Sequence, residues 1–230
     1  MTQEKLIKEL VREGYLKSPA IIEAFQKIKR ADFVPEGEGE MAYYNIPLPI
    51  GYGQTISQPL TVAFTLELLE PKKGEKILDI GAGSGWQTAL LSELVGDPLR
   101  HPLRQSADGG ADGGGKVIAI ERIPELKNMA EKNVGKYGFA EKGIAKIILG
   151  DGSKGYSEEA PYDKIVAAAY VKKIPEAWKE QLKIGGRIVA PVGEQMTVLD
   201  KTGPNIFEQR QYFAFLFVPL IEGEVGDKSS

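Results

Sequence analysis

The chain has 230 residues, of which 42% are hydrophobic and 27% are charged, and its formal net charge is −3. A chain of this length can bury a core of its own, and the absence of cysteine excludes disulfides, thiolate zinc sites and cysteine nucleophiles. A single histidine excludes multi-histidine metal sites, so we expect no metal. The chain has no basic run, no apolar stretch of about 18 residues and a charged beginning, so we expect a cytoplasmic protein that binds neither nucleic acid nor membrane.

The first part of the chain is predicted to contain two helices and a loop. Apolar residues recur at helical spacing within residues 6–11 and 21–28, and Ser18 and Pro19 fit the N-cap and first position of the second helix. Residues 35–53 show no period and are rich in Gly, Pro and Tyr, which indicates an irregular but ordered loop.

The rest of the chain alternates helices with short apolar strands. A strand-turn-helix unit is expected at residues 76–94, and further helices are expected at 59–70, 124–137 and 175–182. Further strands are expected at residues 117–120, 144–149, 164–168 and 187–192. This alternation predicts a mostly parallel, doubly wound α/β sheet with helices on both faces. Residues 196–200 and 209–218 predict an antiparallel hairpin at its C-terminal edge.

The sequence LDIGAGSG at residues 78–85 joins an expected strand to an expected helix. Its alternate glycines permit a tight turn and let backbone amides approach a ligand. In a dinucleotide fingerprint the last position would be Gly or Ala, but here it is Trp86, which disfavours a pyrophosphate cradle. The G-x-G-x-G spacing, with Asp79 two positions before Gly81, instead favours a nucleoside that carries an amino-acid tail, such as S-adenosylmethionine. A glycine-rich turn without a ligand is the alternative.

Two more acidic residues stand at expected strand ends. Glu121 lies 36 residues past Gly85, or 17 once the 19 residues 97–115 are removed, which is close to the spacing of about 20 for a ribose-binding acid. Asp151, between Gly150 and Gly152, fits an acceptor for an adenine amino group, although a lone Asp-Gly is also an ordinary turn.

Residues 96–115 read GDPLRHPLRQSADGGADGGG, and the part from 97 to 115 has almost no apolar content. This low-complexity composition cannot form a packed element, so the segment is an insertion. It joins a helix to the next strand, and such connections lie opposite the ligand crevice. We therefore expect it to be mobile and to take no part in catalysis, His101 included.

Several segments together resemble the protein-L-isoaspartate O-methyltransferase family. They are GYGQTISQP at residues 51–59, the LDIGAGSGW loop, IERIPEL, GDGSKG, APYDKIV, IPEAWKEQLKIGGRIVAPVG and the terminal FVPL. The resemblance runs from about residue 31 to residue 220 and implies a Rossmann-like, S-adenosylmethionine-dependent methyltransferase fold. It divides the chain into N-terminal helices with an active-site loop (1–58), a core (59–220) carrying the insertion (97–115), and a tail (221–230).

The resemblance also implies an activity and a set of site residues. The activity is methyl transfer from S-adenosylmethionine to the α-carboxylate of L-isoaspartyl residues in damaged proteins and peptides, by an enzyme that we expect to be a monomer. The assigned active-site serine of the family maps onto Ser57. The cofactor set is Gln54, Thr55, Ile56 and Ser57 above the cofactor, Asp79, Gly81, Gly83 and Gly85 below its methionine portion, Glu121 and Arg122 at the ribose, and Asp151 and Gly152 at the adenine. Pro191, Val192 and Gly193 are weaker candidates for contact with the peptide.

Other interpretations of these residues stay open. From the residues alone, Ser57 ahead of Pro59 is an ordinary helix-entry residue, and Tyr52 and Trp86 are expected to be packing residues. An S-adenosylmethionine enzyme of the same fold acting on RNA or a small molecule is one alternative function, because substrate choice lies in grafted segments. A catalytically silent relative that binds cofactor or peptide is the other.

Overall fold

The structure, a computed structural model, describes residues 1–96, 114–213, 219–221 and 223. Most of the expected insertion, with His101, lies outside these residues, as do the last residues of the expected C-terminal hairpin and most of the tail. Among the helices of the described part, none combines the length and the apolar character that a membrane span requires.

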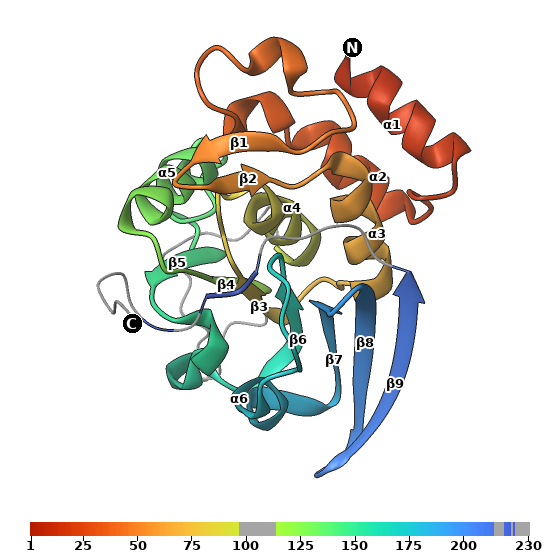
Figure 1. Ribbon diagram of the computed structural model, residues 1–230, viewed down its shortest axis with the longest axis vertical. Coiled ribbons are helices and arrows are strands. Elements are labelled where there is room, and N and C mark those ends of the chain that lie inside the picture. The colour runs from red at the N-terminus through yellow and green to blue at the C-terminus, as the bar shows by residue number, and fades with distance from the viewer. Residues whose placement is uncertain (97–113, 214–218, 222, 224–230) are drawn as a thin grey trace.

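A seven-stranded sheet with the order β5-β4-β3-β6-β7-β8-β9 forms the centre of the molecule (Figure 1). The first five strands in this order are parallel, and β8 and β9 add an antiparallel hairpin at one edge. The predicted fold class is therefore confirmed. The strands are β3 (Lys76–Ile80), β4 (Lys116–Glu121), β5 (Ala145–Leu149), β6 (Tyr162–Ala167), β7 (Leu182–Val192), β8 (Gln195–Gly203) and β9 (Ile206–Phe213).

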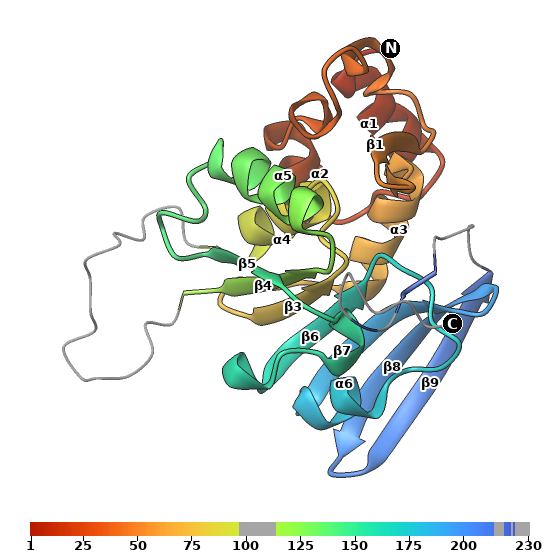
Figure 2. The ribbon, with the colours of Figure 1, turned by 60° about the vertical axis from the view of Figure 1, so that its left-hand side comes forward.

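Helices cover the two faces of this sheet unequally (Figure 2). One face carries α3 (Pro59–Leu69), α4 (Trp86–Val95) and α5 (Pro124–Gly135), with α1 (Gln3–Arg12) and α2 (Pro19–Lys27) packed outside them. The other face carries the short helix α6 (Glu176–Gln181), whose Trp178 is fully buried. Neighbouring strand residues divide between these two layers, since Ile77 packs among the helices of the first face and Leu78 among the residues around Trp178. Burial on both sides explains the continuous apolar run of the strand.

The N-terminal helices are attached to the core by a carboxylate. Ser18 precedes α2 as predicted, but its hydroxyl does not cap that helix. It donates instead to Glu67 Oε2 of α3 at 2.7 Å, and the amides of Lys17 and Ser18 donate to Glu67 Oε1 at 2.7 and 2.8 Å. The role of Ser18 depends on a partner 49 residues away, so local capping propensity could not predict it.

The segment predicted to be an irregular loop contains more regular structure than expected. Residues 35–53 hold a 3-10 turn, Gly39–Met41, and the strand β1 (Leu48–Gly51), which forms a hairpin with the strand that follows, β2 (Gln54–Ile56). A further 3-10 turn, Arg30–Phe33, precedes the segment. The two residues at the tip of the hairpin, Tyr52 and Gly53, have φ values of 55° and 70°, as a type I′ turn requires. Tyr52 is 58% exposed, so the expectation that it packs was wrong.

Gly85, the residue that precedes α4, lies against α5. Its φ of 88° lies in the left-handed region, and a Cβ built there would lie 2.9 Å from Val134 Cγ2 and 3.1 Å from the backbone of Ala130. Both neighbours belong to α5. Glycine is therefore required here by backbone conformation and by packing together.

We predict that Gly85→Ala lowers the free energy of unfolding by about 1–3 kcal/mol, because it adds backbone strain and an overpacked contact. Urea denaturation measures this. Gly135→Ala is the matched control, since Gly135 is helical and a Cβ there meets nothing within 4 Å. The control should be unchanged or more stable, by up to about 1 kcal/mol. A Gly85→Ala protein as stable as the wild type would contradict the packing argument.

Candidate functional site

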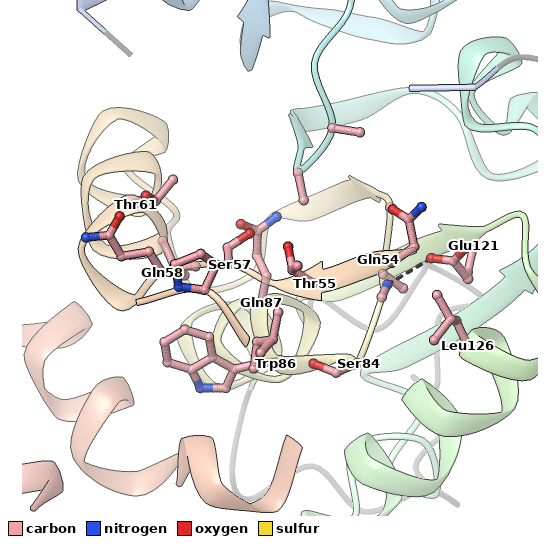
Figure 3. Close-up of a pocket in the computed structure, with 18 residues that line it drawn as sticks. Gln54, Thr55, Ser57, Gln58, Thr61, Ser84, Trp86, Gln87, Glu121 and Leu126 are labelled. Carbon is pink, nitrogen blue, oxygen red and sulfur yellow. Dashed lines mark hydrogen bonds between the residues drawn. The ribbon is translucent and has the colours of Figure 1, made fainter. Parts of the chain in front are cut away.

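A cavity of about 520 Å³ opens at the carboxyl ends of β3 and β4, beneath the β1–β2 hairpin. Ligands of open α/β sheets collect at this edge. Residues of the hairpin and the start of α3 form one wall, and the glycine loop and the start of α4 form another (Figure 3). The lining includes Gln54, Thr55, Ile56, Ser57, Gln58, Thr61, Gly81, Ala82, Gly83, Ser84, Trp86, Gln87, Glu121 and Leu126.

A smaller cavity of about 50 Å³ adjoins the first one. The two share several lining residues, among them Gln54, Gly81 and Glu121. The smaller cavity is also lined by Arg122, Gly152 and the C-terminal residues 219–221. The site is therefore elongated, with Glu121 at the junction of its two compartments.

The glycine loop turns sharply after β3. Gly81, Gly83 and Gly85 have φ values of 86°, 55° and 88°, which residues other than glycine rarely adopt. The amide of Gly81 donates to the carbonyl of Ile120 in β4 at 2.9 Å, so the loop stays attached to the sheet as it turns. The N-terminus of α4 then faces the cavity, where a negatively charged ligand group is favoured.

Glu121 links this loop to the end of β4. Its side chain is buried, its Oε2 accepts from the amide of Gly83 at 2.9 Å, and its Oε1 accepts from the amide of Ile123 at 3.0 Å. Each carboxylate oxygen has a second lone pair that can accept from a ligand hydroxyl. The predicted ribose acid thus lies in the cavity wall with acceptor capacity left.

Asp79 lies beneath the loop and is not among the described residues that line either cavity. It is fully buried, and its two oxygens accept from Gln87 Nε2 at 2.8 Å and Thr88 Oγ1 at 2.7 Å. Burial raises the pKa of Asp79 to about 6. Its carboxyl group therefore holds the first turn of α4 and orients Gln87, which does line the cavity.

The hairpin wall carries the predicted serine. Figure 3 places Ser57, Gln58 and Thr61 at one end of the cavity, with Gln54 and Glu121 at the other. The chain passes from β2 into α3 at this end. Asn45 Oδ1 accepts from the amide of Leu60 at 2.9 Å and so satisfies one of the free donors at the start of α3.

Asp151 stands between Gly150 and Gly152, which line the smaller cavity, but it lies outside the described lining of both cavities. Its Oδ1 accepts from the amide of Ser153 and its Oδ2 from the amide of Gly223, both at 2.9 Å. Although burial acts in the opposite direction, these hydrogen bonds lower the pKa of Asp151. Gly152 lines the smaller cavity, and a Cβ there would lie 2.5 Å from Ile80 Cγ2, so only glycine fits.

The remaining predicted residues lie at different distances from the site. Arg122 lines the smaller cavity, and its Nε donates to the carbonyl of Gly223 at 3.4 Å. Pro191 and Gly193 bond to the backbone of Val171 at the end of β7 and lie outside the described lining of both cavities.

Thr61 and Gln87 line the cavity from helix faces, and the sequence patterns did not indicate either of them. Trp86 was expected only to pack. Trp86 is indeed buried, with its ring edge-on to Phe25 at 5.5 Å, yet it also forms cavity wall. Arg30, which lies behind that wall, carried no local signal. The sequence signal for Gln87 was a polar residue at the second position of an otherwise apolar helix.

Three comparisons describe what this chain is similar to. The family model described as Protein-L-isoaspartate(D-aspartate) O-methyltransferase (PCMT) matches residues 1–225. Proteins named protein-L-isoaspartate O-methyltransferase match from Methanopyrus kandleri (42% identity, 97% of this chain and 92% of the relative) and Aeropyrum pernix (43% identity, 96% and 80%). A crystal structure from Plasmodium falciparum, assigned to the same family and in complex with S-adenosyl-L-homocysteine, has a TM-score of 0.80 at 22% identity and covers 97% of this chain and 100% of its own. That likeness supports the fold.

We predict that Asp79 makes the protein less stable as its carboxyl group ionises. Its folded pKa of about 6 exceeds the ordinary aspartate value of 3.8, so its contribution to stability is full below pH 3.8 and is lost as the pH rises through 6. The whole effect amounts to about 3 kcal/mol. Relative to Asp79→Asn, the free energy of unfolding of the wild type should fall by about 2 kcal/mol between pH 4 and pH 7.5, as measured by denaturation.

Asp151→Asn is the control for this measurement. Although burial opposes them, backbone hydrogen bonds lower the pKa of Asp151 below the ordinary value of 3.8, so its protonation differs between the folded and unfolded protein mainly at more acid pH. The difference in stability between the wild type and Asp151→Asn should be nearly constant over the same pH range. If the difference in stability between the wild type and Asp79→Asn were also independent of pH, burial would not have raised the pKa of Asp79, which would contradict the prediction.

Proposed function

This chain belongs to the protein-L-isoaspartate(D-aspartate) O-methyltransferase family, and from that membership we propose that it methylates the α-carboxylate of L-isoaspartyl residues with S-adenosylmethionine. The observation that carries the proposal is the elongated cavity, which has the glycine loop and Glu121 at one end and Ser57 at the other. A cofactor and a substrate group can meet inside such a site. The ester closes to a succinimide without the enzyme, and hydrolysis returns part of the material to aspartyl linkage.

The residues present fit the cofactor. A nucleoside with an amino-acid tail needs an elongated site with polar groups near its middle, and Glu121 stands at the junction of the two compartments. We assign the ribose to Glu121, the adenine to the smaller cavity beside Gly152 and Arg122, and the methionine portion to the loop at Gly81 and Gly83. The N-terminus of α4 supports the last assignment, because the tail carries a carboxylate.

The other predicted cofactor residues take supporting roles in this proposal. Gln54, Thr55 and Ile56 form the wall above the cofactor, and Gln54 reaches both compartments. Asp79 and Gly85 act from beneath, Asp79 by orienting Gln87 and Gly85 by allowing α4 to approach α5. Asp151 shapes the turn that presents Gly152 and contacts the C-terminal segment through Gly223.

The chemistry asks for positioning rather than for a strong base. S-adenosylmethionine supplies a methyl group that its sulfonium already activates, and the substrate carboxylate is ionised at neutral pH. A carboxylate oxygen bonds to the methyl carbon as the carbon–sulfur bond breaks, which yields the methyl ester and S-adenosylhomocysteine. We propose that the Ser57 hydroxyl donates to the substrate carboxylate and aligns it. The hairpin and the apolar side chain of Ile56 exclude water around the reacting atoms.

Proteins and peptides that contain isoaspartyl residues are the partners of this activity. We still predict that the protein is cytoplasmic and monomeric. We also predict that it does not bind nucleic acid, and the net charge of −3 and the absence of a basic run support this.

The deciding experiment offers the protein labelled S-adenosylmethionine and matched peptides that differ only in an L-isoaspartyl or L-aspartyl residue at one position. We expect label in the isoaspartyl peptide alone. Label in neither peptide would contradict the proposal and would favour a silent relative. Label in RNA or a small molecule instead would identify a methyltransferase of the same fold with another substrate.

We predict that Ser57→Ala and Glu121→Gln separate the two ends of the site. Loss of a hydrogen bond to a charged group should lower the kcat of Ser57→Ala about 10- to 100-fold and leave the affinity for S-adenosylhomocysteine unchanged. Glu121→Gln should weaken that affinity about 10- to 100-fold, since an amide cannot accept from both backbone amides and ribose. Steady-state kinetics and calorimetry measure the two effects. Equal loss of affinity in both variants would contradict the assignment.

A further inference from the structure

Arg30 is a buried charge that the reaction described above does not use. It is 1% exposed, and no carboxylate among the described residues pairs with it. Its guanidinium donates to three carbonyls instead: Nη1 to Ala42 at 2.6 Å, and Nη2 to Ile46 at 3.0 Å and to Ser57 at 3.1 Å. Its Nε has no partner. Burial lowers the pKa of Arg30 to about 10, which leaves it charged at neutral pH.

This arrangement is costly for stability alone. An unpaired buried charge loses its hydration, and carbonyl dipoles compensate for that loss only in part. Replacing a buried charged group by an apolar side chain of similar volume is often neutral or stabilising. An arginine at this position therefore calls for a reason beyond packing, and the carbonyls that it binds indicate one.

The three carbonyls belong to the segment that forms the hairpin wall of the cavity. Ile46 directly precedes Pro47, which lines the cavity, and Ser57 lies in the two-residue connection between β2 and α3. The guanidinium carbon also lies 5.3 Å from the centre of the Trp86 ring, which forms the facing part of the wall. A planar fork can hold carbonyls in fixed directions, whereas a lysine ammonium acts as a point charge. Arg30 thus contacts both walls from behind, at the Ser57 end and away from Glu121.

We propose that Arg30 is a positioning residue, which fixes the Ser57 backbone and the Trp86 ring from behind the cavity wall and touches neither cofactor nor substrate. This inference rests on the proposed function, because it assigns to Arg30 the orientation of the serine that aligns the substrate carboxylate. It locates the contribution of Arg30 in the transfer step. Cofactor affinity, which depends mainly on Glu121 and the glycine loop, changes little.

Tyr137 offers a matched control for a purely structural tether. Its hydroxyl donates to Asp32 Oδ2 at 2.6 Å and accepts from the amide of Lys29 at 2.9 Å. Tyr137→Phe therefore removes two hydrogen bonds between the segment that follows α5 and the turn that holds Arg30. It removes no hydrogen bond to the described residues 42–58.

The experiment compares Arg30→Lys, Arg30→Met and Tyr137→Phe with the wild type. It measures urea stability, affinity for S-adenosylhomocysteine, kcat on an isoaspartyl peptide, and backbone hydrogen exchange of residues 42–58. Both Arg30 variants should lower kcat at least about 10-fold, because each loses one or more charge-assisted hydrogen bonds. Both should keep cofactor affinity within about threefold. Arg30→Lys should retain more activity than Arg30→Met. Exchange in residues 42–58 should be faster in both.

Tyr137→Phe should lower stability and keep both kcat and the exchange of residues 42–58. Two results would overturn the inference: Arg30 variants with wild-type kcat and exchange, or a Tyr137→Phe protein that loses kcat as they do. If Arg30→Met does not fold, Arg30→Lys decides between these outcomes. If the wild type does not label the isoaspartyl peptide, the proposed function fails, and the exchange measurement still decides whether Arg30 holds the segment.

Discussion

The sharp turn of the glycine loop after β3 is the constraint on which the site depends. It brings the amide of Gly83 to within 2.9 Å of Glu121 Oε2, so that the ends of two neighbouring strands form one surface. Because Gly85 has no side chain, α4 can pack against α5 while its first turn faces the cavity. Asp79 holds that turn from beneath through Gln87 and Thr88. A loop of any other geometry would separate these groups.

The opposite wall is built by a different principle. The β1–β2 hairpin forms a two-stranded sheet of its own and, among the described residues, pairs with no strand of the central sheet. Its buried side chains Leu48, Ile50 and Ile56 join the hydrophobic core, and Arg30 binds backbone carbonyls on both sides of it. One wall therefore belongs to the parallel sheet, and the other is held by apolar packing and by hydrogen bonds to backbone atoms.

The acidic residues near the strand ends show how burial and hydrogen bonding give similar side chains different properties. Asp79 is fully buried among neutral partners, which raises its pKa, whereas Asp151 accepts from backbone amides, which lower its pKa. Glu121 accepts from two amides and stays in contact with the cavity. The three carboxylates lie at or near the carboxyl ends of neighbouring strands, yet burial and hydrogen bonding give each a different task.

Patterns that depend on near neighbours were sufficient to predict the α/β fold, the glycine loop and the place of Glu121 at the end of β4, because strand and helix periods and alternate glycines are local properties of the chain. Local patterns did not predict the hairpin at Tyr52, the partner of Ser18, the burial of Asp79 or the position of Arg30. The hairpin is local, but its type I′ turn has Tyr52 where Asn, Asp or Gly is usual. The other three features depend on atoms that are remote in sequence. Folding brings Arg30 to Ser57 and Gln87 to the cavity wall, so tertiary structure alone decided how the site is held.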